Sequence, residues 1–118
     1  MEYLALIYSD ETVWQGFSDD TRTAMYEQYG EFASAAGDAV VLVGGEELGP
    51  TASATTVRLR DGRQLVTDGP YAEAKEALGG YFILDCESLD EALSWAARIP
   101  GASHGAVEVR QVHVDEEA

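Results

Sequence analysis

The segment Glu2–Tyr8, with the sequence EYLALIY, decides the fold of this chain of 118 residues. Apolar side chains occupy both alternating sets of positions, so a strand formed here has two faces to bury rather than one. A single layer of helices covers only one face of a sheet. In so short a chain a second copy is the simplest cover for the other face, and the pattern therefore predicts a homodimer that packs sheet on sheet.

Two helices are predicted from their capping signals and from apolar residues at helical spacing. Ser18 is a suitable N-cap for the first helix, which Gly37 is expected to end. Ser88 and Glu91 form a capping box for the second helix, and Pro100–Gly101 terminates it.

The remaining apolar segments favour strands. Asp61-Gly62 is a strong signal for a two-residue hairpin turn, Gly44–Pro50 indicates a flexible turn, and a bulge or a change of buried face is expected near Arg110–Gln111. Together with the two helices, these strands predict an α+β fold with a ferredoxin-like βαββαβ core and an extra β-hairpin strand. The predicted strands are Glu2–Tyr8, Val40–Val43, Thr55–Arg60, Gln64–Thr67, Tyr81–Cys86 and Ala106–Val114.

Composition predicts one domain over residues 1–114, followed by an acidic tail at residues 115–118 that is expected to be frayed. The net charge of −15, from 22 acidic and 7 basic residues, argues against direct binding of nucleic acid or of anionic membranes. The single cysteine, Cys86, excludes an intrachain disulfide, and no Cys/His cluster has zinc spacing. With no signal peptide, phosphate loop or dinucleotide fingerprint, we expect a cytoplasmic protein without metal or cofactor.

The richest chemical motif is the segment Asp68–Glu76, with the sequence DGPYAEAKE, which links two apolar segments. Asp-Gly-Pro enforces a tight turn that fixes the first carboxylate. Asp68 is therefore a candidate proton acceptor, Tyr71 and Tyr81 are candidate proton donors, and Lys75 is a candidate cation for a bound ligand.

Each of these residues also has a structural interpretation that stays open. Asp68 can cap its own turn by accepting backbone N–H groups, and Lys75 can pair in solvent with Glu73 or Glu76. The two tyrosines can serve as core or dimer-interface rings.

Two further residues are candidates for ligand binding. Glu46 follows Gly44–Gly45, whose N–H groups could approach a ligand, although such glycines also serve the turn itself. His104 lies in a loop of small residues that could cover a pocket mouth, although a lone loop histidine is commonly just solvated.

The chain resembles the DGPF branch of the YCII-related proteins over nearly its whole length. That branch carries Asp-Gly-Pro-Phe-Ala-Glu where this chain has Asp68–Glu73, with Tyr71 in place of the phenylalanine. The other matching segments are Leu4–Tyr8, Val43–Glu46, Thr55–Arg58, Gly79–Tyr81, Leu89–Pro100 and Val107–Arg110. The resemblance implies a ferredoxin-like fold that dimerises through its sheets, in a group whose biochemical role is mostly undefined.

The same resemblance implies that a histidine/aspartate mechanism does not transfer. YCII-like relatives outside this branch carry a proposed catalytic histidine on the first helix and an aspartate before a proline after the second. This chain has Tyr26, Gln28 and Tyr29 in the first region and Ile99 before Pro100. Any acid–base chemistry must then use Asp68 and the tyrosines.

Two functions remain open on the sequence. The first is a small-molecule-binding domain, possibly a lyase- or isomerase-like enzyme in which Asp68 acts as acid and base. The alternative is a non-enzymatic regulatory module that acts through protein contacts, because members of this branch are often associated with extracytoplasmic-function sigma factors.

Overall fold

The structure is a computed structural model, and it describes residues 1–115. The acidic tail predicted at residues 115–118 therefore lies, apart from Asp115, outside the described residues. The elements are β1 (Glu2–Ser9), α1 (Glu11–Gln15), α2 (Asp19–Asp38), β2 (Leu42–Glu47), the 3₁₀ turn η1 (Thr51–Ser53), β3 (Thr55–Arg60), β4 (Arg63–Asp68), β5 (Ala77–Asp85), α3 (Leu89–Ala96), the 3₁₀ turn η2 (Pro100–Ser103) and β6 (Ala106–Gln111).

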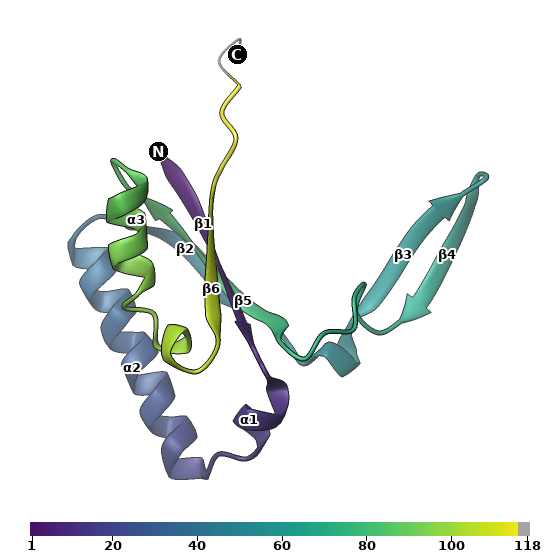
Figure 1. The fold of residues 1–118 in the computed structure, drawn as a ribbon, viewed down its shortest axis with the longest axis horizontal. Helices are drawn as coiled ribbons and strands as arrows, with labels where there is room; N and C mark the ends of the chain where they lie inside the picture. Colours follow the sequence, from purple (N-terminus) through teal and green to yellow (C-terminus); the bar gives the residue numbers. More distant parts are fainter. Residues whose placement is uncertain (116–118) are drawn as a thin grey trace.

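Four strands form one antiparallel sheet in the order β2-β5-β1-β6, and α2 and α3 lie on one face of it (Figure 1). The strands before and after each helix are separated in the sheet by one other strand: β5 lies between β1 and β2, and β1 lies between β5 and β6. This split βαβ arrangement is the ferredoxin-like topology. The α+β prediction is confirmed. Within residues 1–115, no helix has both the length and the apolar character needed to cross a membrane.

Strand β1 lies at the centre of this sheet, and its two sets of side chains have different environments. Tyr3, Ala5 and Ile7 are buried in the core beneath the helices, together with Phe32 of α2 and Leu84 of β5. Burial of these apolar side chains is the main stabilisation of the fold.

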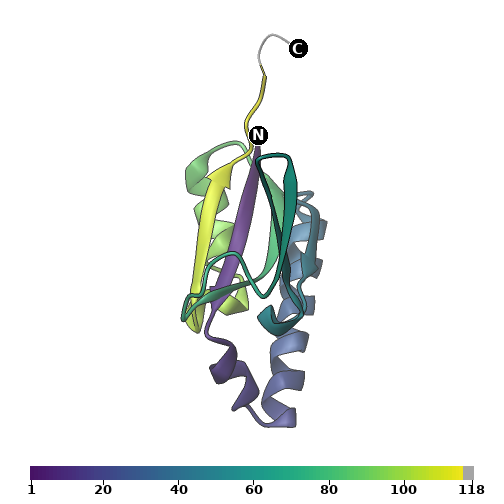
Figure 2. The ribbon, with the colours of Figure 1, turned by 90° about the vertical axis from the view of Figure 1, so that its right-hand side faces the viewer.

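The alternate side chains of β1 project from the other face of the sheet, which we call the open face. Strand pairing places Leu6 beside Tyr81 and Leu4 beside Ile83 there, and Tyr8 follows on β1. All five side chains are only partly buried. Figure 2 looks towards this side of the sheet, with the helices behind it. The structure thus supplies the helix layer that the sequence predicted, and cover of the open face by a second copy stays a prediction.

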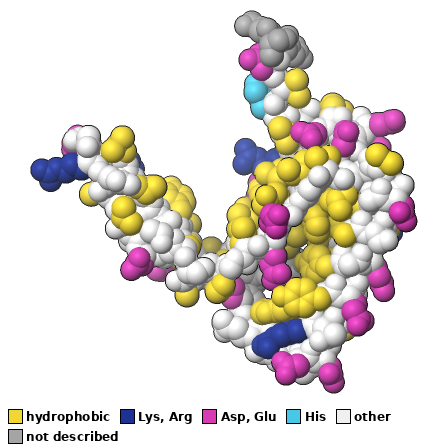
Figure 3. Space-filling model, turned by 180° about the vertical axis from the view of Figure 1, so that it is seen from behind, with side chains coloured by type: hydrophobic (Ala, Val, Ile, Leu, Met, Phe, Trp, Pro, Cys, Tyr) yellow, Lys and Arg dark blue, Asp and Glu magenta, His cyan; other side chains and the backbone are white. Residues whose placement is uncertain are grey.

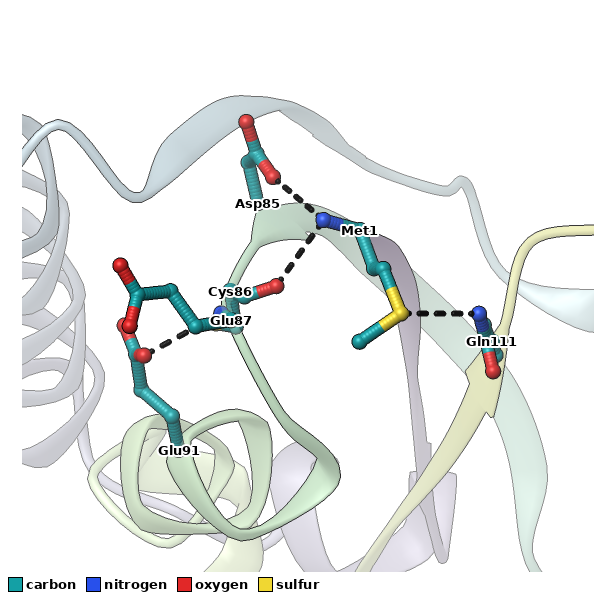
Figure 4. Close-up of polar contacts among 6 residues, drawn as sticks. All are labelled: Met1, Asp85, Cys86, Glu87, Glu91 and Gln111. Carbon is teal, nitrogen blue, oxygen red and sulfur yellow. Dashed lines mark hydrogen bonds and ion pairs between the residues drawn. The ribbon is translucent and has the colours of Figure 1, made fainter. Parts of the chain in front are cut away.

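Both predicted helix caps are present. The Ser18 hydroxyl oxygen accepts a hydrogen bond from the backbone N–H of Thr21 at 3.1 Å, and the Ser88 hydroxyl oxygen accepts one from Glu91 at 3.2 Å. The Glu91 carboxylate in turn accepts the N–H of Glu87 at 3.2 Å (Figure 4), so the first turn of α3 is held from both directions.

The chain start is fixed beside this cap. The Met1 ammonium donates to the Asp85 carboxylate at 3.1 Å and to the Cys86 carbonyl oxygen at 3.0 Å, and the Gln111 amide contacts the Met1 sulfur at 3.3 Å (Figure 4). These contacts join the ends of β5, β1 and β6 at one edge of the molecule.

Three predicted features differ in the structure. The first helix continues through Gly37 to Asp38, and β2 contains Gly44–Glu47 rather than ending before them. Close packing explains the second difference: a Cβ on Gly45 would lie 2.5 Å from the Tyr81 carbonyl oxygen, so the glycine permits a ladder that side chains would block. The bulge predicted near Arg110–Gln111 is wrong, because the β1–β6 register is unbroken up to Gln111 and the strand ends there.

The predicted hairpin is confirmed and stands apart from the rest of the molecule. Strands β3 and β4 form their own two-stranded sheet, with Asp61 and Gly62 at φ values of 50° and 74° in the turn. We call residues 55–68 the arm, and Figure 1 shows it projecting away from the body. The Cα radius of gyration is 16.4 Å, against about 13.5 Å expected for a compact domain of this length.

Val40 occupies a strained position between α2 and β2, and its substitution tests that strain. Its φ is 58°, a left-handed value that a β-branched residue adopts at a cost, and its side chain is 85% exposed. We expect Val40→Gly to raise the free energy of unfolding by roughly 0.5–1 kcal/mol in urea denaturation, because little packing is lost. Val43→Gly, within β2, is the matched control and should destabilise the protein; destabilisation by both variants to the same extent would contradict the strain argument.

Candidate functional site

A cavity of about 580 Å³ lies between α1, the first half of α2 and the β2–β5 side of the sheet. Figure 3 shows hydrophobic side chains gathered between this side of the sheet and α2. Two glycines create the space: Gly45 and Gly80 follow the strand phase that faces the helices, where any side chain would reduce the cavity. The volume is in the range of pockets that hold small organic ligands.

Aromatic rings form much of the cavity wall. The Trp14 ring meets the Tyr26 ring edge-on at 5.4 Å and the Phe17 ring at 6.1 Å, measured between ring centroids. On the sheet side, Tyr29 stacks on Phe82 at 6.4 Å. Such a wall suits a flat ring, which can pack against faces and edges.

The short helix α1 places Trp14 in this wall, and local polar contacts hold the helix. The Asp10 carboxylate caps it by accepting the N–H and the hydroxyl of Thr12, at 2.9 and 2.6 Å. At its other end the Arg22 guanidinium donates to the carbonyl oxygens of Trp14 and Gln15, at 3.2 and 2.8 Å. The guanidinium carbon also lies 5.8 Å from the centre of the Trp14 ring, a cation–π contact.

A phenol and a carboxylate meet at the exposed rim of the cavity. The Tyr26 hydroxyl donates to Oε1 of Glu47 at 3.1 Å. Desolvation raises the pKa of Tyr26, and the hydrogen bond and negative charge of Glu47 raise this pKa further. Burial likewise raises the pKa of Tyr29, which a backbone hydrogen bond at Gly101 partly opposes. Both phenols are therefore protonated donors at neutral pH.

Two other carboxylates at the cavity are already engaged. Glu11 accepts the backbone N–H of Thr51 at 3.1 Å and also the Thr51 hydroxyl, which joins α1 to η1 at the base of the arm. Asp10 is occupied by the Thr12 bonds, which lower its pKa, and the charge of Lys75 lowers this pKa slightly further. Glu47 differs from these two carboxylates, because it accepts a hydrogen bond from the Tyr26 phenol and none that holds α1 in place.

Three of the predicted site residues line this cavity: Glu46, Tyr81 and His104. The His104 ring packs edge-on against Phe17 at 5.6 Å, so it belongs to the same wall. Glu46 and Tyr81 are directly paired in the β2–β5 ladder, one position away from residues that face the helices, so their side chains project from the open face.

The other three predicted site residues, Asp68, Tyr71 and Lys75, are not brought to the cavity wall. The Asp68 carboxylate is exposed at the end of β4 and accepts no hydrogen bond from the described residues. The turn is held instead by its backbone: Gly69, at a φ of 106°, donates to Ala54 at 2.7 Å.

Tyr71 is 80% exposed, and its ring is stacked under the guanidinium of Arg58 at 5.4 Å. Lys75 is exposed as well. Its positive charge contributes to lowering the pKa of Asp10, a residue of the cavity lining.

Comparison with known proteins fits this architecture. The family model of the YCII-related domain matches residues 1–114. The chain belongs to the YCII-related family. An uncharacterised protein of Rhizobium meliloti (strain 1021) is 40% identical over 119 residues, which span 93% of this chain and 90% of that protein.

Among solved structures, 5-chloro-2-hydroxyhydroquinone dehydrochlorinase from Burkholderia phenoliruptrix AC1100, in complex with 2,5-dihydroxybenzoquinone, is similar to this YCII-related chain with a TM-score of 0.54. The match covers 99% of this chain and 98% of that chain at 16% sequence identity. A likeness at this level of identity shows a shared fold.

Sequence reasoning missed the residues that shape the cavity of this YCII-related protein. Helix α1 was not predicted, although Asp10 followed by Thr12 is a capping signal that could have located it. Tyr26 and Tyr29, three residues apart on α2, were noted where other relatives carry a histidine, and the structure places both in the wall. Among residues 1–115 there is no group of three or more His, Cys, Asp or Glu residues suited to hold a metal ion.

The raised pKa of Tyr29 predicts a specific response to alkaline pH. Above pH 10, the ordinary pKa of tyrosine, the unfolded phenol ionises before the folded one, so the folded state loses stability as pH rises through this window. Tyr29→Phe removes this contribution, and its free energy of unfolding should fall less steeply than that of the wild type as the pH rises above 10. Equal slopes in urea denaturation across this range would contradict the buried state of the phenol.

Proposed function

We propose that this protein binds a small, uncharged aromatic compound with hydroxyl or carbonyl substituents in the cavity between α1, α2 and the sheet. The observation that carries this proposal is a cavity of about 580 Å³ with an aromatic wall, which has the Tyr26–Glu47 hydrogen bond at its exposed rim. Ring packing provides affinity, and the few polar groups set orientation.

The polar groups define which substituents fit. Tyr26 and Tyr29 stay protonated and can donate to a carbonyl or hydroxyl oxygen, while Glu47 can accept a hydroxyl proton. Asp10 and Glu11 add negative charge to the same lining. An anionic ligand would meet this charge unfavourably, so a neutral one is favoured.

The similar dehydrochlorinase supports this ligand class. That structure is a complex with 2,5-dihydroxybenzoquinone, a single ring with hydroxyl and carbonyl oxygens. A single ring with hydroxyl substituents fits a cavity of this size. Because 2,5-dihydroxybenzoquinone itself ionises to an anion at neutral pH, the uncharged hydroquinones are the members of this class that the acidic lining favours.

A lyase- or isomerase-like proton transfer is the reaction that these groups support. Two carboxylates are candidates for the proton acceptor, Glu47 in the cavity and Asp68 on the arm. Glu47 is favoured because a phenol is already within hydrogen-bond distance of it, so donor and acceptor lie on the same ligand site. Asp68 with Tyr71 would act only on a ligand that reaches the base of the arm.

We also propose that the protein is a homodimer that packs the open faces of two sheets together. Leu4, Leu6, Tyr8, Tyr81 and Ile83 form an apolar stripe there, and a second copy presents the same stripe. Self-complementary apolar faces suit a two-fold interface.

Thermal-shift measurements with simple uncharged hydroquinones, and with the anionic 2,5-dihydroxybenzoquinone for comparison, test the ligand proposal. We expect a ligand of this class to raise the Tm of the wild type, and Trp14→Ala to weaken binding by about tenfold or more through loss of an aromatic wall. Glu47→Gln, which keeps the shape of the side chain, should weaken hydroxylated ligands selectively.

Asp68→Ala is the matched control, because this residue lies outside the cavity lining. Loss of binding in Asp68→Ala but not in Trp14→Ala would move the site to the base of the arm. If no compound of the class binds folded wild-type protein, the proposal fails, and the alternative of a regulatory module acting through protein contacts gains support.

A further inference from the structure

The arm has exposed side chains of two different kinds on its two faces. Strand pairing puts Val57 opposite Val66 and Leu59 opposite Gln64, so one face is apolar. Val57, Leu59 and Val66 are 59%, 68% and 61% exposed. The other face carries Arg58, Arg60 and Arg63, around Leu65.

The body of the chain does not support the arm. No strand of the four-stranded sheet is hydrogen-bonded to β3 or β4 among the described residues. A two-stranded hairpin is marginally stable in water unless it packs against another element. Apolar side chains exposed on such a hairpin therefore indicate a surface that another molecule covers.

The charge of the arm identifies the kind of partner. Residues 55–68 contain three arginines and two aspartates, a net charge of +1, while the whole chain has a net charge of −15. The rest of the chain is thus strongly acidic. A second copy of this chain offers both an acidic surface and an uncovered apolar sheet, so it complements the arm in charge and in polarity.

The shape of the chain permits this exchange. The arm stands in front of the open face rather than behind the helices (Figures 1 and 2), which leaves a wide gap between the arm and the body (Figure 3). A second copy whose open face lies against that of the first would reach into this gap. Two-fold symmetry then places each arm against the other copy, and the contact closes on itself.

We infer that residues 55–68 are an exchange arm that each copy of this chain packs against its partner, through the apolar face of Val57, Leu59 and Val66 and through the arginines of the other face. The inference rests on the proposed homodimer and goes beyond it, because it assigns the hairpin to the interface as well as the sheet. The base of the arm also supplies Leu48, Pro50 and Leu78 to the cavity wall, so arm docking fixes one side of the ligand site.

Light scattering coupled to size-exclusion chromatography, with a dimer Kd from analytical ultracentrifugation, tests the arm. The wild type should be a dimer, and Leu59→Asp and Val66→Asp should each weaken dimerisation by about tenfold or more. Val40→Asp is the matched control, because it places the same new charge on an exposed residue of the body and should leave the Kd unchanged.

A second variant tests the charged face independently of the apolar one. Reversing Arg58, Arg60 and Arg63 together to Glu should weaken the dimer most at low salt, and added salt should reduce the difference from the wild type. Circular dichroism of each variant checks that the body, whose core the arm does not enter, is still folded.

The outcomes separate the two proposals. A dimer whose Kd is unchanged in Leu59→Asp and in Val66→Asp overturns the arm inference and leaves the sheet-to-sheet dimer in place. A wild type that is monomeric at protein concentrations of about 100 μM overturns both the arm inference and the sheet-to-sheet dimer. Weakening in the arm variants, with the Val40→Asp control unchanged, supports the exchange arm.

Discussion

The burial of one face of β1 against α2 and α3 is the constraint on which the rest of this structure depends. Tyr3, Ala5 and Ile7 lie in the core, and β5 and β6 pair with β1 on its two sides. Because side chains alternate along a strand, fixing this face also fixes what stands on the other one. The open face is thus a direct consequence of how the core is built.

The cavity lies where side chains do not fill the space between the helices and the β2–β5 side of the sheet. Gly45 and Gly80 let β2 approach β5 closely and leave the helix-facing surface bare, while α1 closes the space with Trp14. Each part of the wall is held by contacts to a different element: Arg22 holds the end of α1, and Glu11 ties its start to Thr51. Hydrogen bonds thus hold the wall on the helix side and join it to η1 at the base of the arm.

Charge is distributed unevenly between the body and the arm. The strongly acidic body disfavours nucleic acid and anionic ligands, and the arm concentrates three of the seven basic residues of the chain. Asp10 and Glu11, two of the carboxylates at the cavity, are engaged by scaffold hydrogen bonds. Glu47, bonded to Tyr26, is left as the carboxylate best placed to meet a ligand.

The sequence by itself determined the α+β class, both helix caps and the hairpin, because hydrophobic period, capping and turn chemistry are local properties of the chain. Only the tertiary structure revealed the cavity. Asp68 and Tyr71 are conspicuous in the sequence, yet the cavity is built by Trp14, Tyr29 and Glu47, which come from separate elements. Their convergence depends on how helices pack on a sheet and on glycines whose effect is an absent side chain, and neither is visible in a linear pattern.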